Sequence, residues 1–169
     1  MLALALAMLL GVALLAAQSL DAGASSRGES AEVARGQYLA TIMDCGGCHT
    51  PGAIEGRPDP DRSLAGSAVG FALPGGAVVY PKNLTPDLET GLGRWTPEEV
   101  ARAIRQGQSR NGRVLFPVMP WPSYSALSDS DARALAAYLK SVPAVRFAVP
   151  RDTRAGEKPE APYVTVVTP

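Results

Sequence analysis

The chain has 169 residues, a length that predicts one domain. Lysine plus arginine and aspartate plus glutamate each number 16, so the net charge is zero and gives no support to nucleic-acid binding. Neither a Walker-type loop nor a Gly-x-Gly-x-x-Gly fingerprint occurs, which argues against the common nucleotide sites.

The first segment is an apolar leader, because residues 1–17 carry no polar side chain. A small-x-small site of the kind that signal peptidase cuts follows at residues 22–24. Seventeen apolar residues also reach the lower edge of the length that spans a membrane. We therefore expect residues 1–24 to be a signal peptide or an N-terminal membrane anchor. Either one predicts a periplasmic protein or one anchored to the periplasmic face of the inner membrane.

The first predicted helix covers residues 28–45 and runs directly into the sequence CGGCH. Its expected apolar stripe consists of Tyr38, Leu39, Ile42 and Met43. From residue 51 to residue 93 the chain is predicted to be irregular, because prolines and glycines interrupt it repeatedly. So long a connection inside a domain calls for a function, and wrapping a cofactor is one.

The sequence WTPEEVARAIRQG carries the strongest local signal for a helix. Thr96 is a typical N-cap, Glu99 completes a capping box with it, and Gly107 is a natural C-terminal stop. A third helix is predicted to start after Ser128, with an apolar stripe made of Leu135, Tyr138 and Leu139. Between these helices, residues 111–124 contain three prolines and are predicted to be irregular.

The tail, residues 150–169, is rich in proline and charge and ends in the strand-like sequence YVTVVT, which has no evident hairpin mate. It is either a frayed terminus or an edge that pairs with a partner subunit. The outline is an all-α domain over residues 30–149, with three main helices and long loops, followed by an extended tail.

The chain's two cysteines and its one histidine all lie within CGGCH, as Cys45, Cys48 and His49. A structural zinc site needs four such ligands, so zinc is a poor fit. A redox-active Cys-x-x-Cys is expected in a βαβ setting, whereas this one follows a helix. Haem attachment accounts for all three residues, since two thiols form thioethers and the histidine ligates iron. The motif therefore predicts one covalently bound haem c, with a thiol oxidoreductase as the remaining alternative.

Met119 is the predicted sixth ligand of the iron. Met43 lies two residues before the attachment motif, on the side of the histidine, and can hardly reach the opposite face of a haem. Met119 lies between Pro117 and Pro120, in a stiff loop 74 residues after Cys45. The alternative for such a methionine is a flexible core filler. A His/Met pair is typical of electron transfer, whereas a displaceable sixth ligand is typical of a ligand-binding sensor or haem enzyme.

With these motifs, the chain resembles the class I cytochrome c domain, which carries one haem. Its sequences NLTPDLETGLGRWTPEEVARAIRQG, GRVLFPVMPWPSYSALSDSD and ALAAYLKSVP are similar to haem domains of cytochrome c subunits of bacterial membrane-bound alcohol and gluconate dehydrogenases. The resemblance covers residues 33–145. It departs from those subunits in having one haem motif rather than three, and no convincing C-terminal membrane helix.

The resemblance implies a cytochrome c fold in which Cys45 and Cys48 carry the haem and His49 and Met119 ligate it. Gly36, Tyr38 and Tyr138 match the helix crossing of that fold. The implied partners of the haem propionates are Tyr80, Asn83 and Arg113. Ordinary turn and surface roles are the alternative for these three residues.

The function that follows is electron transfer rather than catalysis. The protein is expected to accept an electron from a dehydrogenase and pass it to a respiratory acceptor. It does so either as a free carrier or as a stable subunit, in which case the tail is a possible contact with the partner.

Overall fold

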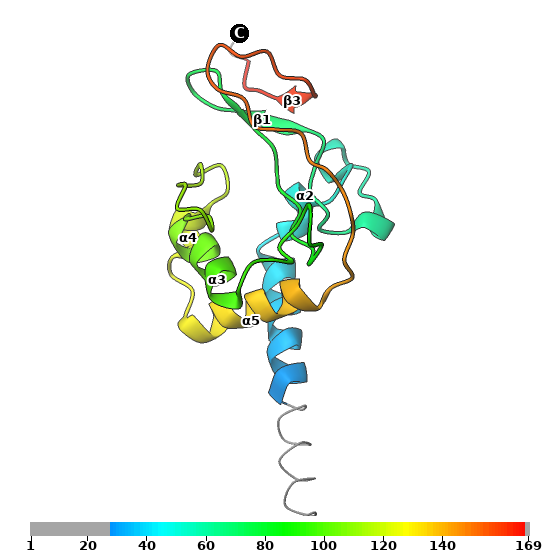
Figure 1. The fold of residues 1–169 in the computed structure, drawn as a ribbon, viewed down its shortest axis with the longest axis vertical. Helices are drawn as coiled ribbons and strands as arrows, with labels where there is room; N and C mark the ends of the chain where they lie inside the picture. Colours follow the sequence, from blue (N-terminus) through cyan, green and yellow to red (C-terminus); the bar gives the residue numbers. More distant parts are fainter. Residues whose placement is uncertain (1–27, 168–169) are drawn as a thin grey trace, which may run out of the picture.

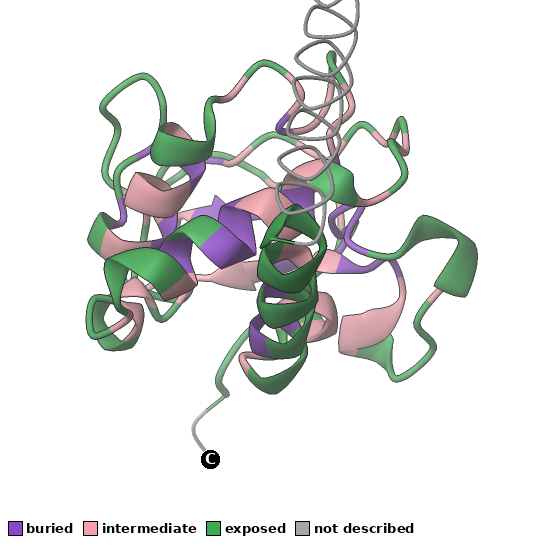
Figure 2. Cartoon of the chain, turned by 90° about the horizontal axis from the view of Figure 1, so that it is seen from below, coloured by how far each residue is buried: buried purple, intermediate pink, exposed green. Residues whose placement is uncertain are grey.

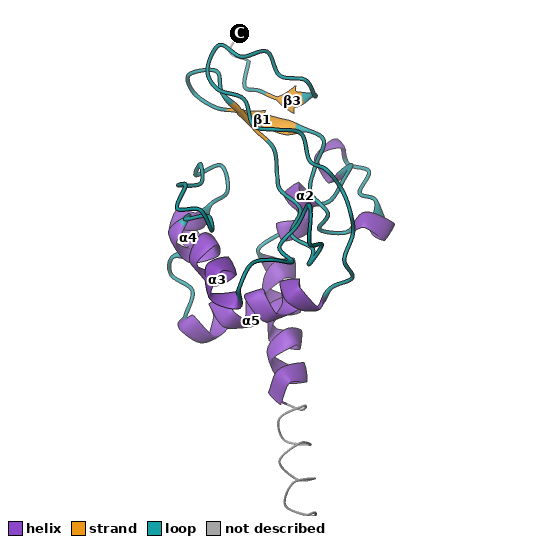
Figure 3. Ribbon diagram, viewed as in Figure 1, coloured by secondary structure: helices purple, strands orange, loops and turns teal. Residues whose placement is uncertain are grey.

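The computed structural model describes residues 28–167. The structure is mostly helical (Figures 1 and 3), as predicted, with few short strands. After a helix over residues 28–42, the elements are α2 (Cys45–His49), η1 (Ala53–Glu55), η2 (Pro60–Arg62), β1 (Gly70–Ala72), β2 (Val78–Val79), α3 (Pro97–Gln106), α4 (Trp121–Tyr124), α5 (Asp129–Ser141) and β3 (Tyr163–Val164). The predicted leader lies outside the described residues. Within residues 28–167, no helix has the length and apolar character needed to cross a membrane.

The N-terminal helix ends earlier than predicted and buries a different face. It stops at residue 42, and a turn separates it from α2. Tyr38 and Ile42 are 54% and 59% exposed, so two members of the predicted stripe face solvent. The buried positions on this helix are Gly36, Leu39 and Ala40. Because two of the three are small, a search for large apolar residues missed this face.

The crossing of the N-terminal helix with α5 depends on Gly36. A Cβ built at this position would lie 2.6 Å from the carbonyl carbon of Ala134 and 2.7 Å from Cβ of Tyr138. The two backbones therefore approach more closely than any larger residue permits. The predicted pairing of Gly36 with Tyr138 is confirmed, whereas Tyr38 points to solvent with the Arg35 guanidinium over its ring.

Both C-terminal helices begin as predicted. The Thr96 hydroxyl accepts a hydrogen bond from the Glu99 amide, and the Glu99 carboxylate accepts one from the Thr96 amide, which completes the capping box of α3. Gly107, with φ of 62°, ends this helix in the left-handed region. Ser128 caps α5 by accepting from the Asp131 amide. These signals act within three or four residues, which is why the sequence reveals them.

Removing the α3 cap should cost a moderate amount of stability. Thr96→Ala leaves the Glu99 amide without its acceptor and should lower the free energy of unfolding by about 1 kcal/mol. Denaturant unfolding of the haem-loaded protein, followed by helical circular dichroism, measures this loss. Thr41→Ala, at an exposed helical position, is the control and should change stability by less than about 0.5 kcal/mol. Equal stability of both variants would show that the cap contributes nothing.

The segment predicted to be irregular, residues 51–93, contains a β-hairpin. β1 and β2 pair antiparallel, with Phe71 opposite Val79. Their connection turns on Gly75 and Gly76, whose φ values of 91° and 87° require glycine. The prediction of an irregular segment was wrong here, because the sequence PGG between two apolar runs is a hairpin signal. Likewise, α4 forms a single helical turn in the proline-containing stretch that was predicted to be irregular.

As far as β3, the tail is paired with the rest of the chain and is not a frayed terminus. β3 pairs parallel with β1, and Gly70 lies opposite Tyr163, so the sheet has the order β2-β1-β3. The strand partner that the tail lacked locally is therefore supplied by its own chain. β3 lies at the edge of the sheet, and its pairing with another subunit stays a prediction.

The core lies where the helices meet (Figure 2). It combines residues of the N-terminal helix, α3 and α5 with two loop leucines: Leu39, Ala40, Leu64, Leu92, Val100, Ile104, Leu135, Ala136 and Leu139. The Lys140 ammonium group ties the loop before α3 to α5, donating to the carbonyls of Leu92, Gly93 and Trp95 at 2.9–3.0 Å. This attachment fixes one wall of the cavity described next.

Candidate functional site

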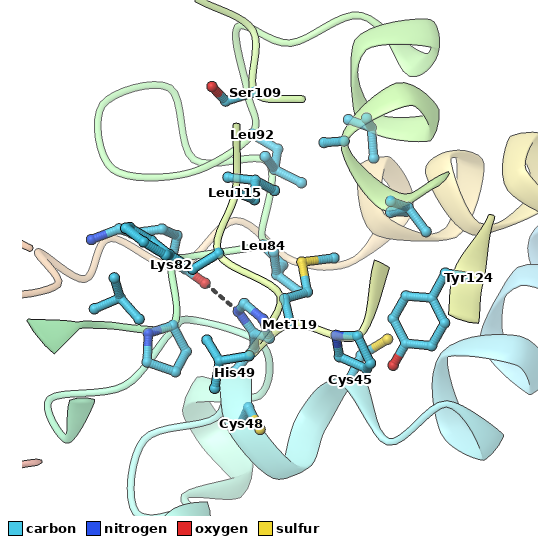
Figure 4. Close-up of a pocket in the computed structure, with 18 of the residues that line it drawn as sticks. Cys45, Cys48, His49, Lys82, Leu84, Leu92, Ser109, Leu115, Met119 and Tyr124 are labelled. Atoms are coloured by element: carbon cyan, nitrogen blue, oxygen red, sulfur yellow. Dashed lines mark hydrogen bonds between the residues drawn. The ribbon is translucent and has the colours of Figure 1, made fainter. Parts of the chain in front are cut away.

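A large cavity is enclosed by α2, by α3 and by the loops before and after α3 (Figure 4). Its empty space, with the solvent at its open mouth included, is about 1370 Å³. The lining is mainly apolar and includes Leu84, Leu92, Trp95, Ile104, Leu115 and Phe116. The cavity therefore suits a mostly apolar ligand.

The two cysteines reach this cavity from α2. Cys45 and Cys48 lie three residues apart on the helix and both line the cavity. The helix starts after Asp44, whose φ of 52° is left-handed and whose carboxylate accepts from the Gly47 amide at 3.2 Å. A Cβ at Gly47 would lie 2.6 Å from Cγ of Asp44, so glycine is needed there for the cap. The residue that caps α2 therefore lies directly before the motif, and the amide that it binds lies within the motif.

His49 is held in one tautomer. Its Nδ1 lies 2.7 Å from the carbonyl oxygen of Lys82, shown as the dashed line in Figure 4. Because a carbonyl can only accept, Nδ1 carries the hydrogen and Nε2 keeps its lone pair. Burial lowers the pKa of His49, which favours the neutral imidazole. A neutral imidazole with an oriented ring is the form that ligates a metal ion.

The thiols do not suit thiol–disulfide exchange. Burial raises the pKa of Cys45 to about 11 and also raises the pKa of Cys48, and in both cases the nearby Asp44 carboxylate adds to the shift. Both thiols therefore stay protonated near neutral pH. Exchange catalysts depend on a depressed thiol pKa, so this environment argues against a thiol oxidoreductase.

Met119 lines the same cavity, from the loop that precedes α4. Two side chains hold this loop. The Trp121 indole donates to the Leu115 carbonyl at 3.0 Å, and the Tyr124 hydroxyl donates to the Met43 carbonyl at 3.2 Å. Met43 lines the cavity as well, so both methionines of the described residues lie at the site. The cysteines, the histidine and a thioether thus come together from distant parts of the chain.

The sequence matches the cytochrome c family over residues 33–143. The chain belongs to the cytochrome c family. This membership confirms the predicted fold and implies a covalently bound haem c in an electron-transfer protein rather than a catalytic enzyme.

Several curated relatives of this cytochrome are subunits of dehydrogenases. It is 36% identical over 124 residues to the cytochrome c subunit of a quinone alcohol dehydrogenase from Gluconobacter oxydans. This match covers 73% of this chain and 24% of the relative. It is 39% identical over 120 residues to the gluconate 2-dehydrogenase cytochrome c subunit of Pantoea cypripedii, with 71% and 25% covered. It is 35% identical over 107 residues to the fructose dehydrogenase cytochrome subunit of Gluconobacter japonicus, with 63% and 20% covered. The chain thus spans about a quarter or less of the length of these relatives.

The residues present fit a haem c. The chemistry of the donor set agrees, because two thiols on one helix turn lie next to a neutral imidazole with a free Nε2, inside a mostly apolar cavity. Cys45 and Cys48 would hold the haem covalently. His49 and one of the two methionines would ligate its iron.

The three predicted propionate partners have different locations. Tyr80 and Arg113 line the cavity, but the Tyr80 hydroxyl donates to the Ala161 carbonyl at 2.8 Å. Asn83 is not part of the lining. It is 1% exposed, and its side-chain amide bonds Thr90, Val145 and Thr85. The structure thus assigns Asn83 to the loop that supports the site, and brings only the other two to the cavity.

Sequence reasoning missed three residues at the cavity. Lys82 offers its carbonyl to His49, Tyr124 anchors the loop of Met119, and Asp152 reaches the cavity from the tail. Asp152 and Lys82 form an ion pair at 2.7 Å although they are 70 residues apart in the chain. No local pattern signals such a pair. For Tyr124, its position five residues after the proline-flanked Met119 could have indicated a role at the site.

Proposed function

We propose that this protein is an exported c-type cytochrome that carries single electrons through one haem ligated by His49 and Met119. The observation that carries the proposal is the convergence of Cys45, Cys48, His49 and Met119 on one apolar cavity. The bound haem supplies a reversible one-electron couple between ferrous and ferric iron. Everything else is done by the chain, which attaches the group, orients its ligands and keeps water away.

The contacts around the ligands favour electron transfer over ligand binding. The Lys82 carbonyl holds the His49 ring from behind, and Trp121 and Tyr124 hold the loop of Met119 at two points. Ligands that are fixed in this way keep similar positions in both oxidation states. A soft thioether also favours reduced iron and raises the reduction potential.

The partners are proposed from the relatives. Their names describe cytochrome subunits of alcohol, gluconate and fructose dehydrogenases. We infer a dehydrogenase as electron donor and a respiratory acceptor, on the periplasmic side of the membrane, with residues 1–24 as the export signal or anchor. The protein acts as a free carrier or as a stable subunit. The exposed edge strand β3, with Tyr163 46% exposed, supports the second arrangement.

Fractionation of cells that express the full chain tests the location and the state of assembly. Haem in the soluble periplasmic fraction, with a new N-terminus near residue 25, supports a cleaved leader; haem in the membrane fraction supports an anchor. Gel filtration of the native fraction then separates a lone chain from a complex with dehydrogenase activity. Haem protein confined to the cytoplasm would contradict the proposal.

An absorption spectrum tests the cofactor and its ligands. The protein should be matured in a periplasm that contains haem-attachment machinery and measured oxidised and reduced. A c-type reduced spectrum, with a weak sulfur-to-iron charge-transfer band in the oxidised form, is expected. Ready binding of carbon monoxide by the reduced protein, without that band, would instead support a ligand sensor or haem enzyme.

Replacing both thiols should abolish covalent attachment. In Cys45→Ser/Cys48→Ser no thioether can form, so acid–acetone extraction should remove the haem completely, whereas the wild-type protein retains it. Haem staining after denaturing electrophoresis provides a second measurement. The exposed Thr41→Ala variant should retain haem like the wild type. Haem that resists extraction from the double variant would disprove attachment at these cysteines.

A further inference from the structure

Residues 145–164, called the C-terminal strap below, lie beyond the part of the chain that matches the cytochrome c family, which ends at residue 143. In Figure 1 the strap (orange to red) leaves the end of α5 and runs back along the molecule to the hairpin of β1 and β2. It therefore returns from the helices to the chain segment that borders the cavity. The family match gives no account of what these contacts do.

The strap is joined to the hairpin by backbone hydrogen bonds. Buried Thr153 donates its amide to the Val78 carbonyl at 2.8 Å, and its hydroxyl accepts from the Val78 amide at 3.1 Å. Further along, β3 pairs with β1, and the Ala161 carbonyl accepts the Tyr80 hydroxyl. The segment from Val78 to Tyr80 is thus held by the strap at several points.

The Asp152 carboxylate makes three contacts at the cavity. Its Oδ1 accepts from the Tyr80 amide at 3.0 Å and from the Lys82 ammonium group at 2.7 Å. Its Oδ2 lies 3.6 Å from the Arg113 guanidinium. Asp152, Lys82 and Arg113 all line the cavity, so one carboxylate lies between two cations at its wall. Because the Asp152 side chain is only 26% exposed, solvent screens its charge incompletely.

Lys82 connects this carboxylate to the histidine. The side chain of Lys82 is bound by Asp152, and its carbonyl accepts the hydrogen of His49 Nδ1 at 2.7 Å. Two residues earlier, the Tyr80 amide is bound by the same carboxylate. The carbonyl that orients the imidazole therefore lies in a segment fixed by the strap. Groups that hydrogen-bond a ligating histidine set its orientation and its basicity.

We propose that the C-terminal strap tunes the haem site, with Asp152 as a positioning residue that holds the His49 acceptor and lowers the reduction potential. The proposal rests on the proposed ligation by His49. The charge effect follows from electrostatics, because a nearby carboxylate stabilises the more positive oxidised site and opposes addition of an electron. Without this carboxylate, the positive charges of Lys82 and Arg113 would no longer be offset by Asp152.

The experiment is a potentiometric titration of the haem-loaded full chain. Asp152→Asn keeps an acceptor for the Tyr80 amide but removes the charge, and should raise the reduction potential. Asp152→Glu should leave it near the wild-type value. Glu157→Gln is the matched control, because it also removes a carboxylate from the strap. The Glu157 carboxylate bonds Arg151 and lies outside the cavity lining, so its loss should shift the potential less. An unchanged reduction potential in Asp152→Asn overturns the charge effect. So does a lower potential, which is the result expected if the substitution merely loosens the site and lets water enter.

The positioning role has its own readout in Asp152→Ala, which removes the acceptor as well. Hydrogen exchange of His49 Nδ1–H, followed by NMR in the reduced protein, should become about fivefold to tenfold faster than in the wild type. The exchange rate in Glu157→Gln should not change. Equal rates in Asp152→Ala and wild type overturn the positioning role. A wild-type protein without the c-type spectrum would point to failure of the proposed haem ligation, on which this proposal rests, and that result is distinct from an unchanged potential in Asp152→Asn.

Discussion

Replacing Met119 with alanine should abolish the sulfur-to-iron charge-transfer band and lower the reduction potential. The thioether is a soft, uncharged donor that favours ferrous iron, so its loss favours the ferric state. Axial ligands set haem potentials over a range of about 0.8 V, and we expect a substantial part of that range. The oxidised spectrum and a potentiometric titration measure both effects. Carbon monoxide should also bind the reduced variant readily, because the sixth position is then open.

Met43→Leu is the matched control, because Met43 also lines the cavity. Leucine fills a similar volume, so this variant should keep the band and nearly the wild-type potential. The two variants together decide between the two methionines at the site. If Met43→Leu loses the band and Met119→Ala keeps it, the assignment of the sixth ligand is wrong while the haem attachment stands.

Gly36→Ala should have the largest effect on stability of the single substitutions considered. An alanine in a helix usually stabilises by about 0.5–1 kcal/mol relative to glycine. Here its Cβ would lie 2.6 Å from the carbonyl carbon of Ala134, and a backbone atom cannot rotate out of the way. We therefore expect a net loss at the upper end of the about 1–3 kcal/mol typical of overpacking. Chemical unfolding of the haem-loaded protein measures it.

Gly28→Ala provides the control on the same helix, since nothing lies within 4 Å of a Cβ at that position. It should be neutral or stabilising by up to about 1 kcal/mol, as helix propensity alone predicts. The comparison separates propensity from crowding. A Gly36→Ala protein as stable as Gly28→Ala would show that the helix crossing adjusts at little cost.

Features encoded within a few residues were predictable from the sequence. The capping box of Thr96 and Glu99 and the cap of Ser128 each satisfy helix-end amides three residues away. The attachment motif is likewise complete within five positions. The predicted haem c and cytochrome c fold follow from these local signals together with the resemblance, and the family match confirms them.

Features built from small residues or from distant partners were not predictable in this way. The buried face of the first helix uses Gly36 and Ala40, which carry little signal in a pattern of large apolar residues, and only the resemblance pointed to Gly36. The side chain of Asn83 is polar and borders the proposed site in sequence, yet its hydrogen bonds go to Thr85, to Thr90 and to the Val145 carbonyl rather than into the cavity. Whether a polar residue faces a cavity or its own loop depends on the rotation of the backbone, which no spacing encodes.

By itself, the sequence determined the starts of two helices and the methionines available as ligands, and it predicted the attachment chemistry, because each depends on residue type or on neighbours along the chain. The tertiary structure decided which residues surround these groups. It brought β3 to β1 and placed Asp152 against Lys82, 70 residues away, so that the tail reaches the acceptor of His49. Such contacts arise only when the chain closes on itself, since strand pairing and ion pairing over long separations depend on the packing of everything between them.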